Sequence, residues 1–125
     1  MNRIIICLLG LYSFMIVSCG GPEETDAVNN TSENLDSLLL KSPNDINLLV
    51  KRGNKLFKEY EYDLALNDAA KAYRIDSMNF DARLLYAEVL NNRETRTVED
   101  VQIAQNHYKW VIKKDPKNLR GLVGL

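Results

Sequence analysis

The residues with the most distinctive chemistry in this chain are its cysteines and its histidine, since thiols and imidazoles act as nucleophiles and metal ligands. The 125 residues include two cysteines, Cys7 and Cys19, and one histidine, His107. Cys7 lies inside an apolar run, so an ordinary disulfide framework is not expected. One histidine cannot build a histidine-rich zinc site, no catalytic constellation is recognisable around it, and no glycine-rich phosphate loop is present. We therefore predict that the protein is not an enzyme and that it uses no cofactor and no metal.

Cys19 follows a segment with the composition of a secretory signal. Arg3 precedes an apolar run of about fourteen residues, which is shorter than the roughly 20 needed to span a bilayer. The run ends in Ile16-Val17-Ser18-Cys19, which resembles the lipobox of bacterial lipoprotein signal peptides. The resemblance implies cleavage before Cys19, lipid attachment to its thiol, and a chain anchored in the bacterial cell envelope, at the outer membrane.

Residues 1–18 are therefore expected to be a lipoprotein signal peptide, and residues 19–34 a flexible acidic tether. The tether has few apolar side chains, so burial cannot offset the entropy that it would lose on ordering. Its acidic residues suit a solvated leader and also resemble the surface-export signals of Bacteroidota lipoproteins. The sequence leaves open whether the chain faces the periplasm or the cell surface.

After an expected N-terminal helix and turn over residues 35–45, the sequence repeats. Three turn-like segments align: Ser42–Asp45, Asp76–Asn79 and Asp115–Asn118. The first two start 34 residues apart and the last two 39 apart, which indicates one period with a five-residue insertion. Because proline ends helices, and Asn or Asp caps them, each segment is expected to join two helices.

The residues between these turns follow helical periodicity. Leu49, Gly53 and Leu56 recur at spacings of four and three, and alanines further on do the same. This spacing predicts amphipathic helices over residues 46–59 and 62–76 that pair as a hairpin.

Gly53 stands in the middle of the first predicted helix, where glycine costs about 0.5–1 kcal/mol relative to alanine. Close approach of the partner helix would explain it, with Ala65 and Ala69 as the facing residues. The second unit repeats the plan, with its insertion at Asn92–Arg96 and with Thr97 as the cap of the next helix.

This pattern resembles the tetratricopeptide repeat family, whose unit is a helix-turn-helix of 34 residues. The matching residues are Gly53, Leu56, Tyr62, Ala65 and Ala72 in the first unit, and Ala87, Leu90, Ala104, Tyr108 and Pro116 in the second. The resemblance implies an all-α repeat solenoid. Its two full units would cover residues 46–79 and 80–118, and residues 119–125 would start a third.

The resemblance also implies a groove that binds a protein or peptide and is lined by the first helix of each unit. Carried over to this chain, its residues are Asn47, Val50, Asn54, Phe57, Lys58, Asp81, Leu84, Glu88 and Asn91. Asn47, Val50, Asn54 and Phe57 are three or four residues apart, so they share one side of a helix. We expect an anchored interaction scaffold that concentrates its partner near the membrane, and an ordinary solvated helix face is the alternative.

Other features bear on partners. The net charge is −1, from 16 Lys and Arg against 17 Asp and Glu, so no nucleic-acid partner is expected. The stripe Ile103, His107 and Trp110 is a second candidate contact site on the convex side. The third unit, at residues 119–125, lacks a partner helix, which indicates self-association at this end or a longer chain. In a longer chain, this part would be the N-terminal adaptor of an envelope enzyme, or of an outer-membrane assembly or glycan-uptake component.

Overall fold

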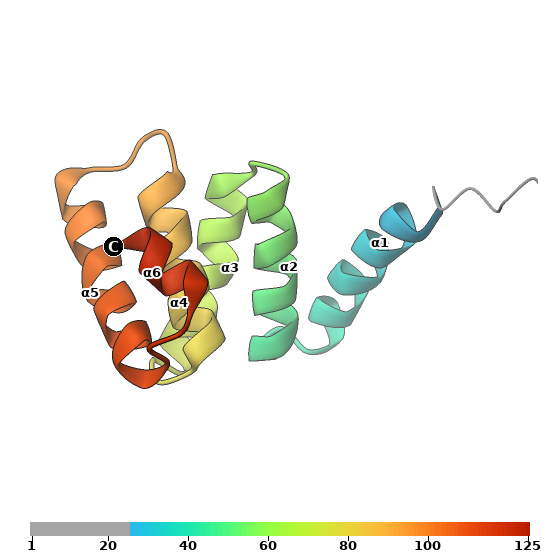
Figure 1. Cartoon of the computed structure of the whole chain (residues 1–125). Helices are drawn as coiled ribbons and strands as arrows, with labels where there is room; N and C mark the ends of the chain where they lie inside the picture. The colour runs from blue at the N-terminus through green and yellow to red at the C-terminus, as the bar shows by residue number, and fades with distance from the viewer. Residues whose placement is uncertain (1–25) are drawn as a thin grey trace, which may run out of the picture.

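The computed structural model describes residues 26–125, and the side chains from residue 34 onward. These residues form six α-helices and no strand (Figure 1). The helices are α1 (Asp26–Lys41), α2 (Ile46–Lys58), α3 (Tyr62–Ile75), α4 (Phe80–Asn92), α5 (Val98–Lys114) and α6 (Leu119–Gly124). The prediction of an all-α protein is confirmed. In this part of the chain, no helix has the length and apolar character needed to cross a membrane.

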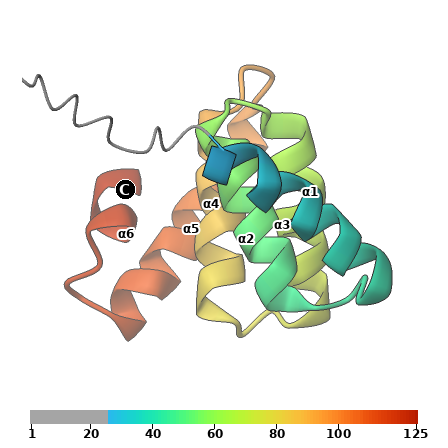
Figure 2. The same cartoon turned by 90° about the vertical axis from the view of Figure 1, so that its right-hand side faces the viewer.

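Each helix packs against the next one along the chain. In addition, α2 contacts α4 and α4 contacts α6, whereas the backbones of α3 and α5 do not come together within residues 26–125. Figures 1 and 2 show α1 at one end of the row, where its backbone approaches only that of α2 among the described helices. The helices α2, α4 and α6 therefore form one side of the molecule.

Small and branched side chains fill the contacts between helices. Ala65 and Ala69 of α3 pack with Leu85 and Val89 of α4, and all four are fully buried. A second core cluster contains one residue from each of α1, α2, α3 and α4, and the third joins α4 to α5. Because alanine occupies so many of these contacts, the helix axes approach closely.

The three turns that were predicted from the aligned segments have the same chemistry. Asp45, Asn79 and Asn118 cap α2, α4 and α6 by accepting a hydrogen bond from the amide three residues on, at 3.1, 3.0 and 2.9 Å. The amide of each cap donates to the carbonyl three residues before it, at 3.1–3.2 Å. Thr97 caps α5 through a capping box with Asp100, as its position predicted. These local bonds fix where each helix begins.

Gly53 lies where three helices converge. A Cβ atom at this position would lie 2.7 Å from Leu85 Cδ2, 3.4 Å from Asp68 Cβ and 3.6 Å from the carbonyl oxygen of Ala65. The predicted close approach is therefore present, and Ala65 faces the glycine as expected. The nearest side chain, however, belongs to α4, which the pattern within one hairpin did not indicate.

The first helix starts earlier than the sequence indicated. It begins at Asp26, so residues 26–34, which we expected to lie in a flexible tether, are helical. Leu35 and Leu39 are buried where α1 packs against the other helices. This burial fixes the C-terminal turns of α1. Each residue added to an existing helix then gains one backbone hydrogen bond, which lowers the free-energy cost of ordering polar residues. The predictions on residues 1–18 and on Cys19 concern residues outside the described part of the chain.

Arg52 connects the first three helices. Its Nε and Nη2 donate to both carboxylate oxygens of Asp68 in α3 at 2.7 Å, and its Nη1 donates to Asp36 in α1, also at 2.7 Å. The Asp68 carboxylate, whose side chain is only 6% exposed, raises the pKa of Arg52 above its ordinary value through these bonds. This bidentate pair satisfies a buried charge.

Replacing Arg52 with alanine should destabilise the fold because Asp68 keeps its burial and loses both donors. Breaking a buried pair costs about 3–5 kcal/mol. Because the Arg52 side chain is 32% exposed, we expect about 2–3 kcal/mol in the free energy of unfolding. Urea denaturation of the full chain measures this value.

Lys55→Ala is the matched control, since it removes a cation three residues away that pairs with Glu59 at 3.4 Å on the same helix. Exposed pairs at this spacing contribute about 0.3–0.5 kcal/mol. Equal losses of unfolding free energy from the two substitutions would show that the Arg52–Asp68 pair stabilises the fold no more than the Lys55–Glu59 pair does.

Candidate binding groove

The nine residues predicted to line the groove differ in how accessible they are. Asn47, Lys58 and Asp81 are exposed, and Val50, Asn54, Phe57 and Asn91 are half-buried. Leu84 and Glu88 are buried, with 1% and 9% of their surface exposed. Exposure alone therefore leaves seven of the nine open to a partner.

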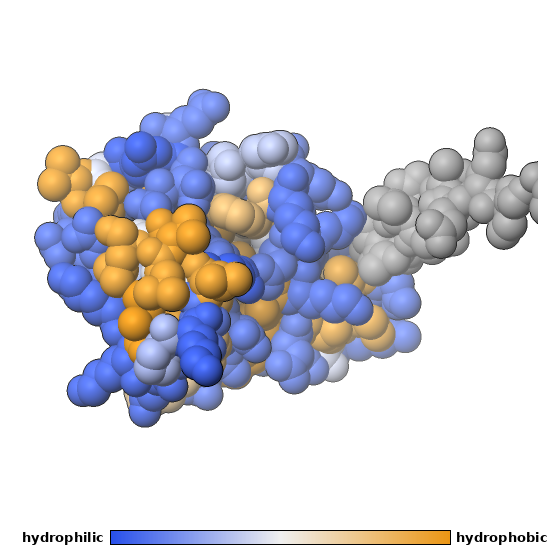
Figure 3. All heavy atoms as spheres, in the orientation of Figure 1, coloured by the Kyte–Doolittle hydropathy of each residue, from blue (hydrophilic) through white to orange (hydrophobic). Residues whose placement is uncertain are grey.

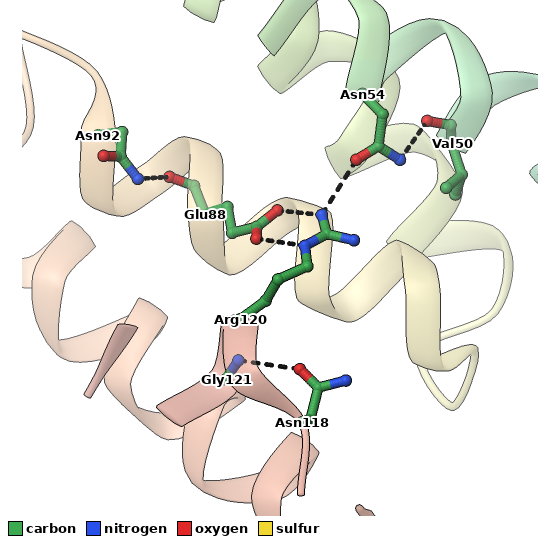
Figure 4. Close-up of polar contacts among 7 residues, drawn as sticks. All are labelled: Val50, Asn54, Glu88, Asn92, Asn118, Arg120 and Gly121. Atoms are coloured by element: carbon green, nitrogen blue, oxygen red, sulfur yellow. Dashed lines mark hydrogen bonds and ion pairs between the residues drawn. The ribbon is translucent and has the colours of Figure 1, made fainter. Parts of the chain in front are cut away.

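A polar network links α2, α4 and α6 at the centre of this surface (Figure 4). Arg120 Nε donates to Glu88 Oε1 at 2.6 Å, and Nη2 donates to Asn54 Oδ1 at 3.0 Å and to Glu88 Oε2. Asn54 in turn donates to the carbonyl of Val50 at 2.8 Å. The Glu88 carboxylate raises the pKa of Arg120, with a smaller contribution from Asp81. The arginine is thus held charged and oriented by three helices.

Arg120 was not among the predicted residues, although the repeat contains a signal for it. It lies 39 residues after Asp81, which is the distance that separates the second and third turns. It therefore has the same place in α6 that Asp81 has in α4. Extending the repeat register into residues 119–125 would have identified it.

A cavity of about 400 Å³ opens beside the network. It is lined by Phe57, Glu88, Asn91, Asn92, Tyr108, Leu119, Arg120, Val123 and Gly124. Phe57, Tyr108, Leu119 and Val123 supply its aromatic and aliphatic surface, and the amides and the ion pair supply the polar groups. This combination suits an apolar side chain attached to a polar backbone.

Apolar side chains continue from the cavity across the outside of α6. Leu119, Leu122, Val123 and Leu125 are 75, 47, 87 and 53% exposed. Figure 3 shows the corresponding apolar area over α6. The accessible apolar surface of the groove is therefore concentrated at its α6 end.

Leu84 does not contribute to the groove. It packs in the cluster that also contains Ala87, Leu90, Tyr108 and Val111. Because α4 is in contact with α2, α3, α5 and α6, little of its surface remains free. A residue at the groove position of this central helix becomes part of the core.

The predicted convex stripe is also more buried than its spacing indicated. His107 is 9% exposed and packs against a stacked pair of tyrosine rings, with its centroid 4.9 Å from that of Tyr73 and 5.5 Å from that of Tyr86. Burial lowers the pKa of His107 below its ordinary value, and the charge of Arg83 lowers it further. The imidazole is therefore held neutral in a site without a facing carboxylate among its described neighbours.

This burial should make the fold sensitive to acid. The unfolded chain binds the His107 proton more readily, at a pKa of about 6.5, than the folded chain does. The stability from the neutral imidazole is therefore complete above about pH 6.5 and is lost as the pH falls towards the lower folded pKa. We expect His107→Gln to reduce the loss of unfolding free energy between about pH 7.5 and pH 5, measured by urea denaturation.

The wild-type chain is measured at the same pH values. Both chains contain the same carboxylates, so the difference between their two slopes of unfolding free energy against pH gives the contribution of His107. Parallel declines in wild type and His107→Gln would show that this imidazole does not control the acid response.

Within residues 26–125, no three His, Cys, Asp or Glu side chains are arranged to hold a metal ion. The described chain belongs to the class of all-α proteins built from helices packed in consecutive pairs. The chain matches no protein-family model, curated protein or solved structure in our comparisons.

Proposed function

We propose that this protein is a lipid-anchored scaffold of tetratricopeptide-like repeats in the bacterial cell envelope. Its partner would be a protein or peptide that lies along α2, α4 and α6. The observation that carries the proposal is the alignment of these three helices, which places a polar network beside a largely apolar cavity.

An extended peptide suits this surface for two reasons. The cavity accepts an apolar side chain, and burial of such a side chain contributes about 1.5–3 kcal/mol. Beside it, Asn91 has an amide that is not engaged by another described side chain, and an amide can both donate to and accept from a peptide backbone. Arg120 and Glu88 add a fixed charge pair that favours one register of the peptide.

Attachment through Cys19 would keep the groove close to the membrane. Cys19 precedes the first described helix by seven residues, and seven residues reach at most roughly 25 Å when extended. A partner in the same membrane would meet the groove at a raised effective concentration. Modest affinity would then suffice for a stable complex.

The anchor is tested by replacing each cysteine with serine in cells fed labelled palmitate. We expect Cys19→Ser to lose the label and to remain as the unprocessed, larger chain, because its hydroxyl cannot replace the thiol as the lipid acceptor. Cys7→Ser is the matched control and should keep both label and processing. Label on Cys19→Ser, or its loss from Cys7→Ser, would refute attachment at Cys19.

The groove is tested by placing a photoreactive benzoylphenylalanine at Asn91 and, as a control, at the exposed Gln102 of α5. In intact cells, irradiation should give a discrete adduct only from position 91. Phe57→Ala in the same chain should reduce that adduct several-fold, because it enlarges the cavity and removes apolar contact. The same adducts from both positions would contradict a groove-specific partner.

A further inference from the structure

On the side opposite the groove, α3 and α5 flank α4 and form a face that the proposed function does not use. The backbones of α3 and α5 do not meet within the described residues, and side chains fill the space between them, with the rings of Tyr73 and His107 4.9 Å apart. Arg83 of α4 lies there, with its guanidinium carbon 4.1 Å from the ring centroid of Trp110 and 5.6 Å from that of Tyr73. The rings hold the arginine plane in place through cation–π contact.

Arg83 lacks the partners that Arg52 and Arg120 have. Its Nε is buried and has no hydrogen-bond partner among the described residues, and its guanidinium forms no ion pair with any described carboxylate. Its two terminal nitrogens are not among the buried atoms and donate to no described acceptor, so this end of the guanidinium is open to an acceptor from a partner.

A second cation borders the same ring. Lys114 Nζ lies 5.6 Å from the Trp110 centroid, and it too forms no ion pair with a described carboxylate. The aspartates that end α3 and α5, Asp76 and Asp115, accept hydrogen bonds from backbone amides of their own turns. Arg83 and Lys114 therefore place two positive charges on this face that form no ion pair with a described carboxylate.

We propose that this face binds an acidic segment of a partner protein, with one carboxylate pairing with Arg83 and a neighbouring one meeting Lys114. The planar guanidinium can donate two parallel hydrogen bonds to a carboxylate, and this geometry favours a carboxylate over a simple point charge. The rings beside it are half-buried between helices, so they can flank a peptide but present no protruding surface for a lipid bilayer. Charge complementarity thus identifies the partner as an Asp- or Glu-rich peptide.

Trp110 provides a direct readout because it is the only tryptophan in the chain. The test uses the full chain in neutral phosphatidylcholine vesicles, titrated with hexaglutamate while the tryptophan emission is recorded. We expect a saturable change that hexaglutamine does not produce and that weakens as salt is raised. Arg83→Gln should weaken binding at least tenfold and Lys114→Gln about threefold, since charge-assisted bonds are lost.

Lys51→Gln is the matched control, since it removes one exposed positive charge from α2, away from Trp110. It should change the affinity less than twofold. Equal weakening by Lys51→Gln and Arg83→Gln would overturn the proposal in favour of nonspecific charge attraction. Because Lys114 is exposed, Lys114→Gln keeps the test valid if Arg83→Gln does not fold, and unchanged affinity in Lys114→Gln would then overturn it.

A second arm replaces the peptide with vesicles that contain phosphatidylglycerol. An emission change that requires Arg83 here, with no response to hexaglutamate, would overturn the proposal in favour of an anionic membrane. The groove is a separate site, so the adduct from position 91 should persist in Arg83→Gln. Failure of either site can therefore be recognised without reference to the other.

Discussion

The approach of three helices at Gly53 is the constraint on which the arrangement of the others depends. A side chain there would meet the terminal methyl of the fully buried Leu85, which would have to shift for α2 to keep its contact with α4. With α2 and α4 fixed side by side, α6 can extend the row and the groove residues share one surface. The glycine gives up some helix propensity, roughly 1 kcal/mol, for this contact.

Two arginines, at the two ends of the molecule, hold helices together through the same kind of contact. Arg52 joins α1, α2 and α3, and Arg120 joins α2, α4 and α6. Each makes a bidentate pair with a buried carboxylate and reaches a third acceptor with a remaining nitrogen. Arg83, stacked between aromatic rings, differs from both because no described carboxylate pairs with it. The contrast separates cations that hold helices together from one that is available to a ligand.

Local patterns in the sequence predicted what local interactions determine. Caps such as Asn79 and Thr97 bond within four residues of themselves, and the helices that they start were expected close to their observed positions. The burial of Leu84 and the role of Arg120 depend on helices from other units, which a pattern within one hairpin does not contain. The early start of α1 has the same origin, because docking of its C-terminal half supports its first turns.

The limited contacts of α1 have a mechanical consequence. Among the described helices, the backbone of α1 approaches only that of α2, and Leu39 also packs with Ala72 of α3 and Ala82 of α4. A pull on the chain that precedes α1 therefore loads this small set of contacts first. In a linear stack, each element separates according to its own neighbour contacts, so α1 can peel away while α2, α4 and α6 stay together. The Asp36–Arg52 bond, whose side chains are 59% and 32% exposed, would break early. Tension would therefore separate α1 and lengthen the protein before it disturbed the groove.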